Sequence, residues 1–437
     1  MSAYTELKKK IQSGKAVVAV VGLGYVGLPI AIEFCRKGYK VHGLDSNKRR
    51  IGRLKKGISY IEDIPSADIR KAVKGKKFNV TSSSSVLNGA DVIIVCVPTP
   101  LRKVKTPDIS YIVKASRSLS ERMRSGQLII IESTTYPGTT RDVILPILRK
   151  SGLELDKDFY LAFSPERIDP GNPKYDLTNI PKVVGGLTRK GTELSRMIYS
   201  KIIDRVVSVS SAEAAEVTKL LENTFRIVNI GLINEFAMLC YKLGIDVWEV
   251  IDAAKTKPFG YMPFYPGPGI GGHCIPADPM YLSWKARKVG FRTEMVDLAA
   301  RINRMLPMHT VKRVGELLRR DKKSFREAKI LLLGVAYKKD VNDLRESPAL
   351  EIIETLRKKK ADVSYHDPYI PYLDVYGIKL KSRPLTPLML KGQDAVVIVA
   401  AHTGVDYKMI AGNAKAVLDT RNVMGKLGIE GDNIVKL

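Results

Sequence analysis

Residues 16–27 read Ala-Val-Val-Ala-Val-Val-Gly-Leu-Gly-Tyr-Val-Gly, and this stretch decides the fold. Its first half is apolar and rich in valine, which predicts a buried strand over 16–21. Glycines follow at Gly22, Gly24 and Gly27, and an apolar helix is predicted from Leu28 to about Arg36. A strand, a glycine turn and a helix in this order are typical of a dinucleotide-binding α/β fold.

The residues of the turn have distinct expected tasks. Gly22 allows the tight turn, Gly24 lets a pyrophosphate approach the backbone, and Gly27 lets helix and strand pack closely. The helix N-terminus faces the phosphates, because its first N–H groups have no partner within the helix. Tyr25 and Val26 lie between these glycines and belong to the predicted cofactor site.

A second strand is predicted over 40–44, with Asp45 at its end. Its carboxylate is placed to accept hydrogen bonds from a ribose hydroxyl, and it favours NAD over NADP because it repels a 2′-phosphate. Lys48, Arg49 and Arg50 follow and weaken this preference, with Arg50 assigned to the adenosine end. We therefore predict NAD as the cofactor.

Further buried strands are predicted over 91–97 and 128–131, and they end in turns that carry Thr99 and Thr134. Ligands of doubly wound sheets lie beyond the carboxyl ends of the strands, so both threonines are assigned to the cofactor site. Ordinary turn chemistry would explain them equally well. Another short apolar strand precedes Ser164-Pro165-Glu166, and Glu166 is a candidate acid or base.

A second α/β unit is predicted near the C-terminal end, with strands at 329–333, 362–366, 394–400 and 416–418 that alternate with helical stretches. It lacks the glycine pattern, but such a sheet can still bind a mononucleotide. Arg345 lies in a polar segment, where it is suited to clamp a phosphate or carboxylate.

A long helix is predicted from Ser210, in a capping box with Glu213, to about Leu243. This helix carries polar residues at spacings of three and four, which places them on one helix face; they are Glu216, Lys219, Asn223 and Arg226. A helix of this length between two nucleotide-binding halves is suited to form a dimer interface.

Residues 266–279 contain four glycines and four prolines, so we expect a shaped loop and no helix or strand interior. This loop presents Cys274, and covalent catalysis on an oxidised carbon is the first hypothesis. The alternative is a small buried apolar side chain, which is our interpretation of Cys35, Cys96 and Cys240.

The composition is that of a soluble globular protein with two or three domains in 437 residues. Four cysteines without paired spacing argue against a disulfide framework or zinc ribbon and favour a reducing cytoplasm, and no metal site is predicted. The uncharged run 16–32 contains three glycines and Pro29, which argues against a membrane span.

The net charge is +27, from 72 basic and 45 acidic residues. The basic residues are scattered, and no nucleic-acid module accompanies them, which favours a solvated surface. Steering of a phosphorylated substrate is the functional hypothesis.

Taken together, these motifs resemble the UDP-glucose/GDP-mannose dehydrogenase family over essentially the whole chain. The shared patterns are Ser-Pro-Glu at 164–166, Lys-x-x-x-Asn at 219–223, Gly-Gly-x-Cys-x-Pro-x-Asp at 271–278 and Asp-x-Arg-Glu-Ser at 343–347. The loop 266–276 and the turn 97–100 look most like the UDP-N-acetylglucosamine 6-dehydrogenases. The UDP-glucose branch typically carries Ser, Phe and Lys where this chain has His273, Ile275 and Ala277.

The resemblance implies an α/β fold of two Rossmann-like, doubly wound parallel-sheet domains joined by a central helical domain. We expect an NAD-binding domain at 1–205, the helical domain with catalytic loop and dimer interface at 206–315, and a UDP-sugar-binding domain at 316–437. The implied partners are a UDP-sugar and a second copy, in a homodimer or higher homo-oligomer, with no nucleic acid or membrane. The implied setting is polysaccharide biosynthesis.

The resemblance also implies a four-electron oxidation of the C6 alcohol of a UDP-N-acetylhexosamine, with UDP-N-acetylglucosamine expected, at the cost of two NAD per turnover. A water held by Asp278 and Lys219 would take the alcohol proton, and the Cys274 thiolate would add to the aldehyde. Lys219 and Asn223 would hold the thiohemiacetal oxygen, and Glu166 with its water would hydrolyse the thioester. Lys219 near the thiol would also depress the pKa of that thiol.

Other residues are assigned by the same resemblance. Arg345 is assigned to the cofactor, and the substrate contacts are Arg167, Ile168, Lys219, Asn223, Arg226, Tyr265, Gly267, Gly271, Tyr337, Lys338 and Arg421. UDP-N-acetylmannosamine and UDP-glucose remain alternative substrates. A β-hydroxyacid dehydrogenase, which performs one oxidation without a thiol, and a nucleotide- or nucleic-acid-binding protein remain alternative classes.

Overall fold

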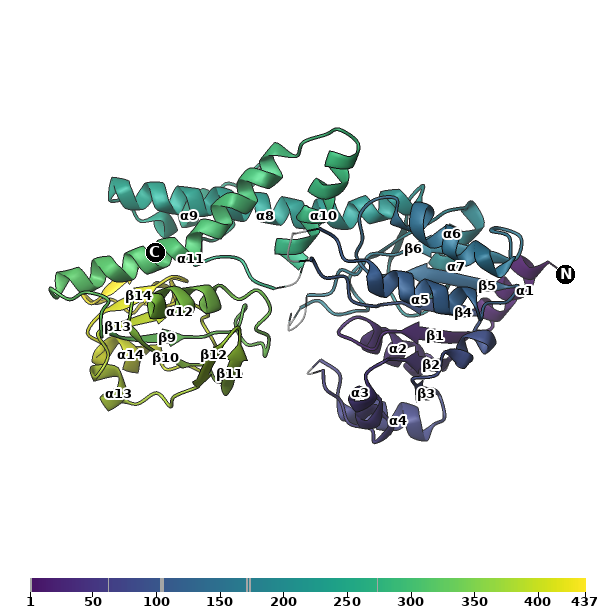
Figure 1. Cartoon of the computed structure of the whole chain (residues 1–437), viewed down its shortest axis with the longest axis horizontal. Helices are drawn as coiled ribbons and strands as arrows, with labels where there is room; N and C mark the ends of the chain where they lie inside the picture. The colour runs from purple at the N-terminus through teal and green to yellow at the C-terminus, as the bar shows by residue number, and fades with distance from the viewer. Residues whose placement is uncertain (1, 62, 103–105, 170–171, 173, 273) are drawn as a thin grey trace. The chain divides into compact units, whose positions relative to one another are not determined.

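A computed structural model describes the chain except for residues 1, 62, 103–105, 170–171, 173 and 273 (Figure 1). The chain divides into two compact units. The first unit comprises 1–222 and 280–291, and the second comprises 223–279 and 292–437. Two helices take part in both units, α8 (Ala212–Leu243) and α10 (Cys274–Lys288).

The first unit is built on one eight-stranded sheet in the order β3-β2-β1-β4-β5-β6-β7-β8. All strand pairs are parallel except β6 with β7. The strands are β1 (Val17–Val21), β2 (Lys40–Leu44), β3 (Phe78–Thr81), β4 (Val92–Val95), β5 (Gln127–Ile131), β6 (Phe159–Phe163), β7 (Lys182–Gly186) and β8 (Val206–Ser208). The order reverses between β1 and β4, which is where ligands of such sheets bind.

Helices cover both faces of this sheet, and alternate residues of β1 enter two different cores. Val18 and Val20 belong to one apolar cluster, and Ala19 and Val21 belong to another. A sheet buried on both faces explains why its strands are continuous apolar runs. The helices are α1 (Ala3–Gln12), α2 (Gly27–Arg36), α3 (Lys48–Lys55), α4 (Ser66–Lys74), α5 (Ser110–Ser120), α6 (Leu145–Leu148) and α7 (Arg189–Tyr199), with short helices η1 (Ser84–Gly89), η2 (Thr140–Ile144) and η3 (Arg149–Ser151).

The second unit contains a five-stranded parallel sheet in the order β10-β9-β13-β14-β15 and a hairpin of β11 and β12. The strands are β9 (Lys329–Leu333), β10 (Asp362–His366), β11 (Tyr372–Val375), β12 (Ile378–Lys381), β13 (Ala395–Ile398), β14 (Val417–Asp419) and β15 (Ile434–Lys436). Its helices are α9 (Val247–Ala254), α11 (Glu294–Arg320), α12 (Pro348–Lys358), α13 (Pro387–Lys391), α14 (Tyr407–Asn413) and α15 (Val423–Lys426).

Within the second unit, helices α8 and α11 pack closely. A Cβ on Gly231 would lie 3.2 Å from Ala299, so glycine permits the approach. The Asn234 amide donates to Asn303 at 2.8 Å, which pairs two buried polar side chains. The predicted fold class, with two doubly wound sheets and a long central helix, is confirmed, whereas the three domain boundaries stay a prediction. Among the described residues, no helix has the length and apolar character needed to cross a membrane.

Two local predictions were wrong. Helix α8 is capped by the Ser211 hydroxyl, which accepts from the N–H of Ala214 at 3.1 Å, so Ser210 and Glu213 form no capping box. The segment 266–279 is irregular up to Gly272, but helix α10 begins at Cys274 and includes Pro276 and Pro279. Pro276 is tolerated because N–H groups in a first helical turn have no partner within the helix.

Candidate active site

The glycine turn after β1 has the shape that a dinucleotide needs. Gly22 has φ +93°, and a Cβ there would lie 2.5 Å from the carbonyl oxygen of Cys96. A Cβ on Gly27, the first residue of helix α2, would lie 1.9 Å from the Gly22 oxygen, so only glycine fits at this position. A Cβ on Gly24 would meet nothing within 4 Å, which leaves open space above the turn for a pyrophosphate. These residues fit NAD.

Asp45 is buried at the end of β2, and backbone groups fix its carboxylate. One oxygen accepts from the N–H of Leu23 at 2.9 Å and the other accepts from the N–H of Asn47 at 2.7 Å. The Arg50 guanidinium lies 3.6 Å from the first of these oxygens. Each carboxylate oxygen has a second lone pair, so Asp45 can still receive a ribose hydroxyl.

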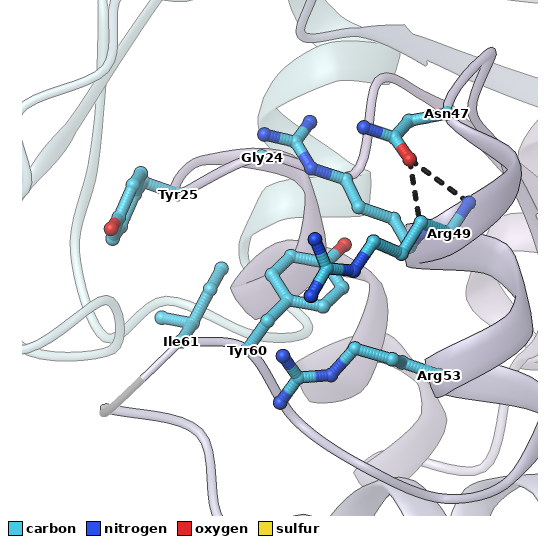
Figure 2. Close-up of a pocket in the computed structure, with 8 residues that line it drawn as sticks. Gly24, Tyr25, Asn47, Arg49, Arg53, Tyr60 and Ile61 are labelled. Carbon is cyan, nitrogen blue, oxygen red and sulfur yellow. Dashed lines mark hydrogen bonds between the residues drawn. The ribbon is translucent and has the colours of Figure 1, made fainter. Parts of the chain in front are cut away.

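Figure 2 shows the cavity beside this acid. It has a volume of about 260 Å³ and is lined by Gly24, Tyr25, Asn47, Arg49, Arg50, Arg53, Tyr60 and Ile61. The guanidinium groups of Arg50 and Arg53 lie 5.6 and 5.9 Å from the centre of the Tyr60 ring. Such contacts are cation–π interactions, and they hold positive charge next to the predicted ribose site. Arg53 and Tyr60 were not predicted as site residues.

The two predicted threonines lie at the same edge of the sheet as Gly22, because β4 and β5 are neighbours. Thr99 is buried and its carbonyl accepts from the hydroxyl of Tyr281 at 2.7 Å, while Thr134 is half-buried. The Ser133 hydroxyl donates to the carbonyl of Val97 at 2.8 Å, which ties the two turns together. Both threonines lie at the carboxyl edge of the sheet, and their contact with a cofactor stays a prediction.

The candidate base Glu166 lies after β6 in a buried ionic cluster. One carboxylate oxygen accepts from the N–H groups of Arg167 and Ile168, each at 2.6 Å. The other oxygen lies 3.2 Å from the ammonium of Lys182, which also donates to Glu132 at 2.8 Å. Lys182 is only 3 % exposed and Glu132 is fully buried.

Burial and neighbouring charge compete within this cluster. Burial opposes ionisation of Glu166, but Lys182, the N–H of Ile168 and Lys219 outweigh it and hold its pKa below the usual range. Burial raises the pKa of Glu132 to about 7 despite the neighbouring Lys182. Glu132 also accepts a short hydrogen bond from the hydroxyl of Tyr199. At neutral pH, Glu166 is therefore the ionised carboxylate of the pair.

Helix α8 carries three buried polar side chains of the predicted stripe, whereas Arg226 is exposed. In the first unit, Glu216 accepts from the N–H groups of Gly138 and Thr140 at 2.6 and 2.9 Å, and burial raises its pKa to about 7. Lys219 is buried and acts electrostatically on Glu166. Glu216 thus fixes the helix to the turn after β5.

In the second unit, the Asn223 amide donates to the buried Asp278 carboxylate at 2.6 Å. Asp278 lies one helical turn after Cys274, whose side chain is exposed at the first residue of α10. His273 lies outside the described residues. The structure therefore pairs Asn223 with Asp278 by a hydrogen bond in the second unit, while Lys219 acts on Glu166 through its charge in the first unit.

Residues 266–272, the glycine segment before Cys274, pack against the domain of the second sheet, and both belong to the second unit. A Cβ on Gly271 would lie 2.6 Å from the Cβ of Tyr337, and the N–H of Gly272 donates to the carbonyl of Arg345 at 2.8 Å. A Cβ on Gly267 would lie 2.4 Å from the Arg421 guanidinium. Four predicted substrate residues, Gly267, Gly271, Tyr337 and Arg421, are thereby gathered along one loop.

Arg421 is held in place by the protein. Its Nε donates to the carbonyl of Val399 at 2.8 Å, and burial lowers its pKa to about 10. Tyr265 stacks on Trp248 at a centroid distance of 6.0 Å, and the Lys426 ammonium lies 5.0 Å from the Tyr265 ring. Trp248 and Lys426 are neighbours that the sequence did not single out.

Arg345 and Arg167 each form an ion pair within their own unit. Arg345 forms a bidentate ion pair with Asp343, in which Nε donates to Oδ1 at 3.1 Å and Nη2 donates to Oδ2 at 2.6 Å. Arg167 forms an ion pair with Glu222 at 2.7 Å. Lys338 is half-buried after β9. The roles of these three cations toward a ligand stay predictions.

The glycine turn, the fixed acid at the end of β2 and the second parallel sheet define an α/β protein that binds a dinucleotide and carries a second sheet of the nucleotide-binding type. Family models match over three segments: the NAD binding domain at 16–203, the central domain at 213–305 and the UDP binding domain at 331–426. The chain belongs to the UDP-glucose/GDP-mannose dehydrogenase family.

Individual relatives agree with this placement. The chain is 37% identical to a UDP-N-acetyl-D-glucosamine 6-dehydrogenase of Pseudomonas aeruginosa, over 88% of this chain and 90% of that protein. It is 36% identical to a UDP-N-acetyl-D-mannosamine dehydrogenase of Pyrococcus horikoshii, over 96% of both chains. A solved structure of a UDP-D-ManNAc dehydrogenase from Pyrococcus horikoshii matches with a TM-score of 0.87 and 34% identity, covering 96% of this chain and 98% of that one.

The Lys182 cluster is the main feature that the sequence analysis missed. A lysine at the start of the apolar strand 182–186 was a usable signal, because a buried ammonium requires an anionic partner. Glu132 directly follows another buried strand. The sequence does not show that β5, β6 and β7 are neighbours in the sheet, and this arrangement brings Glu132, Glu166 and Lys182 together.

Proposed function

We propose that this protein oxidises the C6 alcohol of a UDP-N-acetylhexosamine to the carboxylate, with UDP-N-acetylglucosamine as the preferred substrate. The observation that carries the proposal is the exposed Cys274 thiol at the end of a glycine segment that packs on the UDP binding domain. A single oxidation to an aldehyde needs no thiol, whereas oxidation of the aldehyde gains from a covalent intermediate. Relatives that act on the glucosamine and mannosamine sugars are almost equally similar, so the choice of sugar rests on the sequence motifs.

Two NAD molecules, bound one after the other, would each accept one hydride, and the residues of the chain would handle protons and the carbonyl group. Asp278, which is buried and held by Asn223, would orient the water that takes the alcohol proton. The Cys274 thiolate would then add to the aldehyde carbon. The Lys219 ammonium and the Asn223 amide would stabilise the oxygen as it becomes negative.

Glu166 would complete the reaction by hydrolysing the thioester. Its carboxylate takes a proton from a water while the water oxygen bonds to the carbonyl carbon. The carbon–sulfur bond then breaks, Cys274 leaves as a thiolate, and the uronic acid loses its proton. The N–H groups of Arg167 and Ile168 fix one Glu166 oxygen, and the other, which accepts from Lys182, keeps a second lone pair for the water.

The second sheet would bind the UDP group. The Arg421 guanidinium is suited to the diphosphate, and Tyr265 and Tyr337 offer aromatic faces for the base and the sugar. Lys338 adds a second cation, and Gly267 lets the Arg421 guanidinium come close to the loop backbone. The net charge of +27 would favour approach of a substrate with two phosphates.

The protein is proposed to work as a homodimer through helix α8. Between Leu232 and Leu243 this helix exposes four large apolar side chains at spacings of three and four, Leu232, Phe236, Leu239 and Leu243. An apolar stripe on one helix is self-complementary around a twofold axis. We place the reaction in the cytoplasm, where reducing conditions keep Cys274 as a thiol, and assign the product to polysaccharide biosynthesis.

The test is the yield of NADH per sugar consumed, with limiting UDP-N-acetylglucosamine and excess NAD, run beside UDP-N-acetylmannosamine and UDP-glucose. Two NADH per UDP-N-acetylglucosamine, with little turnover of the others, are expected. Cys274→Ala should abolish formation of the uronic acid, while Cys240→Ala, which changes a buried cysteine, serves as the matched control. One NADH per sugar would contradict the thioester, and faster turnover of UDP-N-acetylmannosamine would contradict the choice of substrate.

A further inference from the structure

Lys182 bridges two carboxylates in the interior of the first unit. Its ammonium lies 2.8 Å from Glu132 and 3.2 Å from Glu166. The side chains of Lys182, Glu132 and Glu166 are 3 %, 0 % and 12 % exposed, so water screens this cluster little.

The cluster contains one carboxyl group more than a simple structural ion pair needs. Two carboxylates share one ammonium, and a buried ammonium needs only one carboxylate to be compensated. Glu132 is the fully buried partner, and the hydroxyl of Tyr199 also donates to it. Glu166 is the partner with remaining exposure, and two backbone N–H groups donate to one of its oxygens.

The groups that act on this cluster come from every neighbouring element. Cys96 follows β4, Glu132 follows β5, Glu166 follows β6, Lys182 begins β7 and Tyr199 ends α7. Lys219 on α8 adds a second positive charge that acts on Glu166. Cys96 and Tyr199 stay neutral, since burial raises the pKa of both groups well above their usual values. The protonation of Glu132 therefore decides how strongly Lys182 acts on Glu166.

We propose that Lys182 is a positioning residue for the hydrolytic step, which orients Glu166 and keeps it ionised, and that Glu132 sets the share of the Lys182 charge that Glu166 receives. This inference rests on the proposed function, in which Glu166 takes the proton from the hydrolytic water. Of the Glu166 oxygens, one is occupied by two N–H groups, and the other keeps a lone pair for water beside the Lys182 contact.

The proposal has a kinetic signature that a purely structural role lacks. Both hydrides leave before the thioester is hydrolysed, so loss of Lys182 slows only the last step. The covalent sugar–Cys274 thioester then accumulates. In Lys182→Met, a rapid burst of two NADH per active site should precede a steady-state rate that is reduced about 100-fold, the scale of general-base effects. Lys182→Arg should restore most of the steady-state rate.

The experiment uses the full-length protein, rapid mixing with NAD and UDP-N-acetylglucosamine, acid quench and intact-protein mass spectrometry. Lys182→Met is expected to carry the sugar adduct, while wild type and Lys190→Met, which removes a surface ion pair with Asp156, should not. Glu166→Gln is the reference for a hydrolysis defect. If Glu166→Gln accumulates the adduct and Lys182→Met does not, the positioning role is wrong. If Glu166→Gln itself shows no adduct, the proposed function of Glu166 is wrong.

Glu132→Gln provides a second test that does not depend on the folding of Lys182→Met. The amide keeps the size of the side chain and an oxygen for Lys182 or Tyr199, and it stays neutral at every pH, like the protonated form of Glu132. Because the pKa of Glu132 is about 7, wild type should lose part of its steady-state rate as the pH rises through 7, when the ionised Glu132 draws Lys182 away from Glu166. Glu132→Gln should lack this loss, and the same decline of the rate in both proteins would overturn the proposal.

Discussion

Substituting Gly267 by alanine tests whether the glycine segment holds Arg421 in position for the substrate. The new Cβ would lie 2.4 Å from Arg421 Nη1 and 3.1 Å from Cζ, which is too close, so the guanidinium must move by about 1 Å. The Arg421 Nε bond to the Val399 carbonyl at 2.8 Å would lengthen with it. A charge-assisted hydrogen bond contributes about 1.5–3 kcal/mol, so loss of one to the diphosphate should raise the KM for the UDP-sugar about 10- to 100-fold.

The assay is initial-rate formation of NADH while either substrate is varied. Gly267→Ala should raise the KM for the UDP-sugar and leave the KM for NAD unchanged, because the cofactor turn belongs to the first unit. Gly412→Ala is the matched control, because a Cβ there meets nothing within 4 Å inside α14, and it should be neutral or slightly stabilising. An unchanged KM for the UDP-sugar in Gly267→Ala would refute the role given to Arg421.

Three further predictions concern other parts of the chain. Asp45→Ser should raise the ratio of kcat/KM for NADP over NAD about 10-fold or more, because a phosphate then meets guanidinium groups without a carboxylate, and adding Arg49→Ala should reverse much of this gain. Burial raises the pKa of Glu216 from 4.5 to about 7. The folded state thus binds this proton more tightly than the unfolded state does. The resulting contribution to the free energy of unfolding, about 3 kcal/mol, is fully present below pH 4.5 and is lost as the pH rises to 7. Urea unfolding of Glu216→Gln should therefore show a correspondingly smaller loss of the free energy of unfolding over that range, and equal pH slopes in the two proteins would contradict the raised pKa. Phe236→Asp should convert the proposed dimer to monomers in sedimentation velocity, whereas Glu235→Ala on the same helix should not.

Much of the fold could be predicted because the sequence is locally consistent. Valine-rich runs buried on both faces, a glycine pattern and an acid at 45 specify the first half of the sheet without knowledge of long-range contacts. The cap of α8 was predicted one residue early, since Ser210 and Ser211 are adjacent and either could accept the first N–H groups. The helical start of α10 was missed because its prolines were taken as evidence against a helix. A proline in the first turn of a helix costs little, since the N–H that it lacks would have no partner within the helix there.

The ionic cluster around Glu166 could not be predicted for a different reason. Its members lie at 132, 166, 182 and 199, and they meet only because β7 pairs antiparallel with β6, the last of six parallel strands in the sheet. Local patterns carry no information about that pairing. The same holds for Gly271, whose need for glycine arises from Tyr337, more than sixty positions further along the chain.

The packing of the glycine segment on the second sheet bears on how such enzymes can be recombined. Gly269, Gly271 and Gly272 fit so closely against Pro348 at the start of α12 and against Tyr337 after β9 that a Cβ at any of them would lie within 3 Å of an atom of one of these residues. A chimera that exchanges only the UDP binding domain, 331–426, would place the glycine segment of one enzyme against the UDP binding domain of another. Crossovers that inherit residues 265–274 together with 331–426 should fold more often and carry the donor's sugar preference with them.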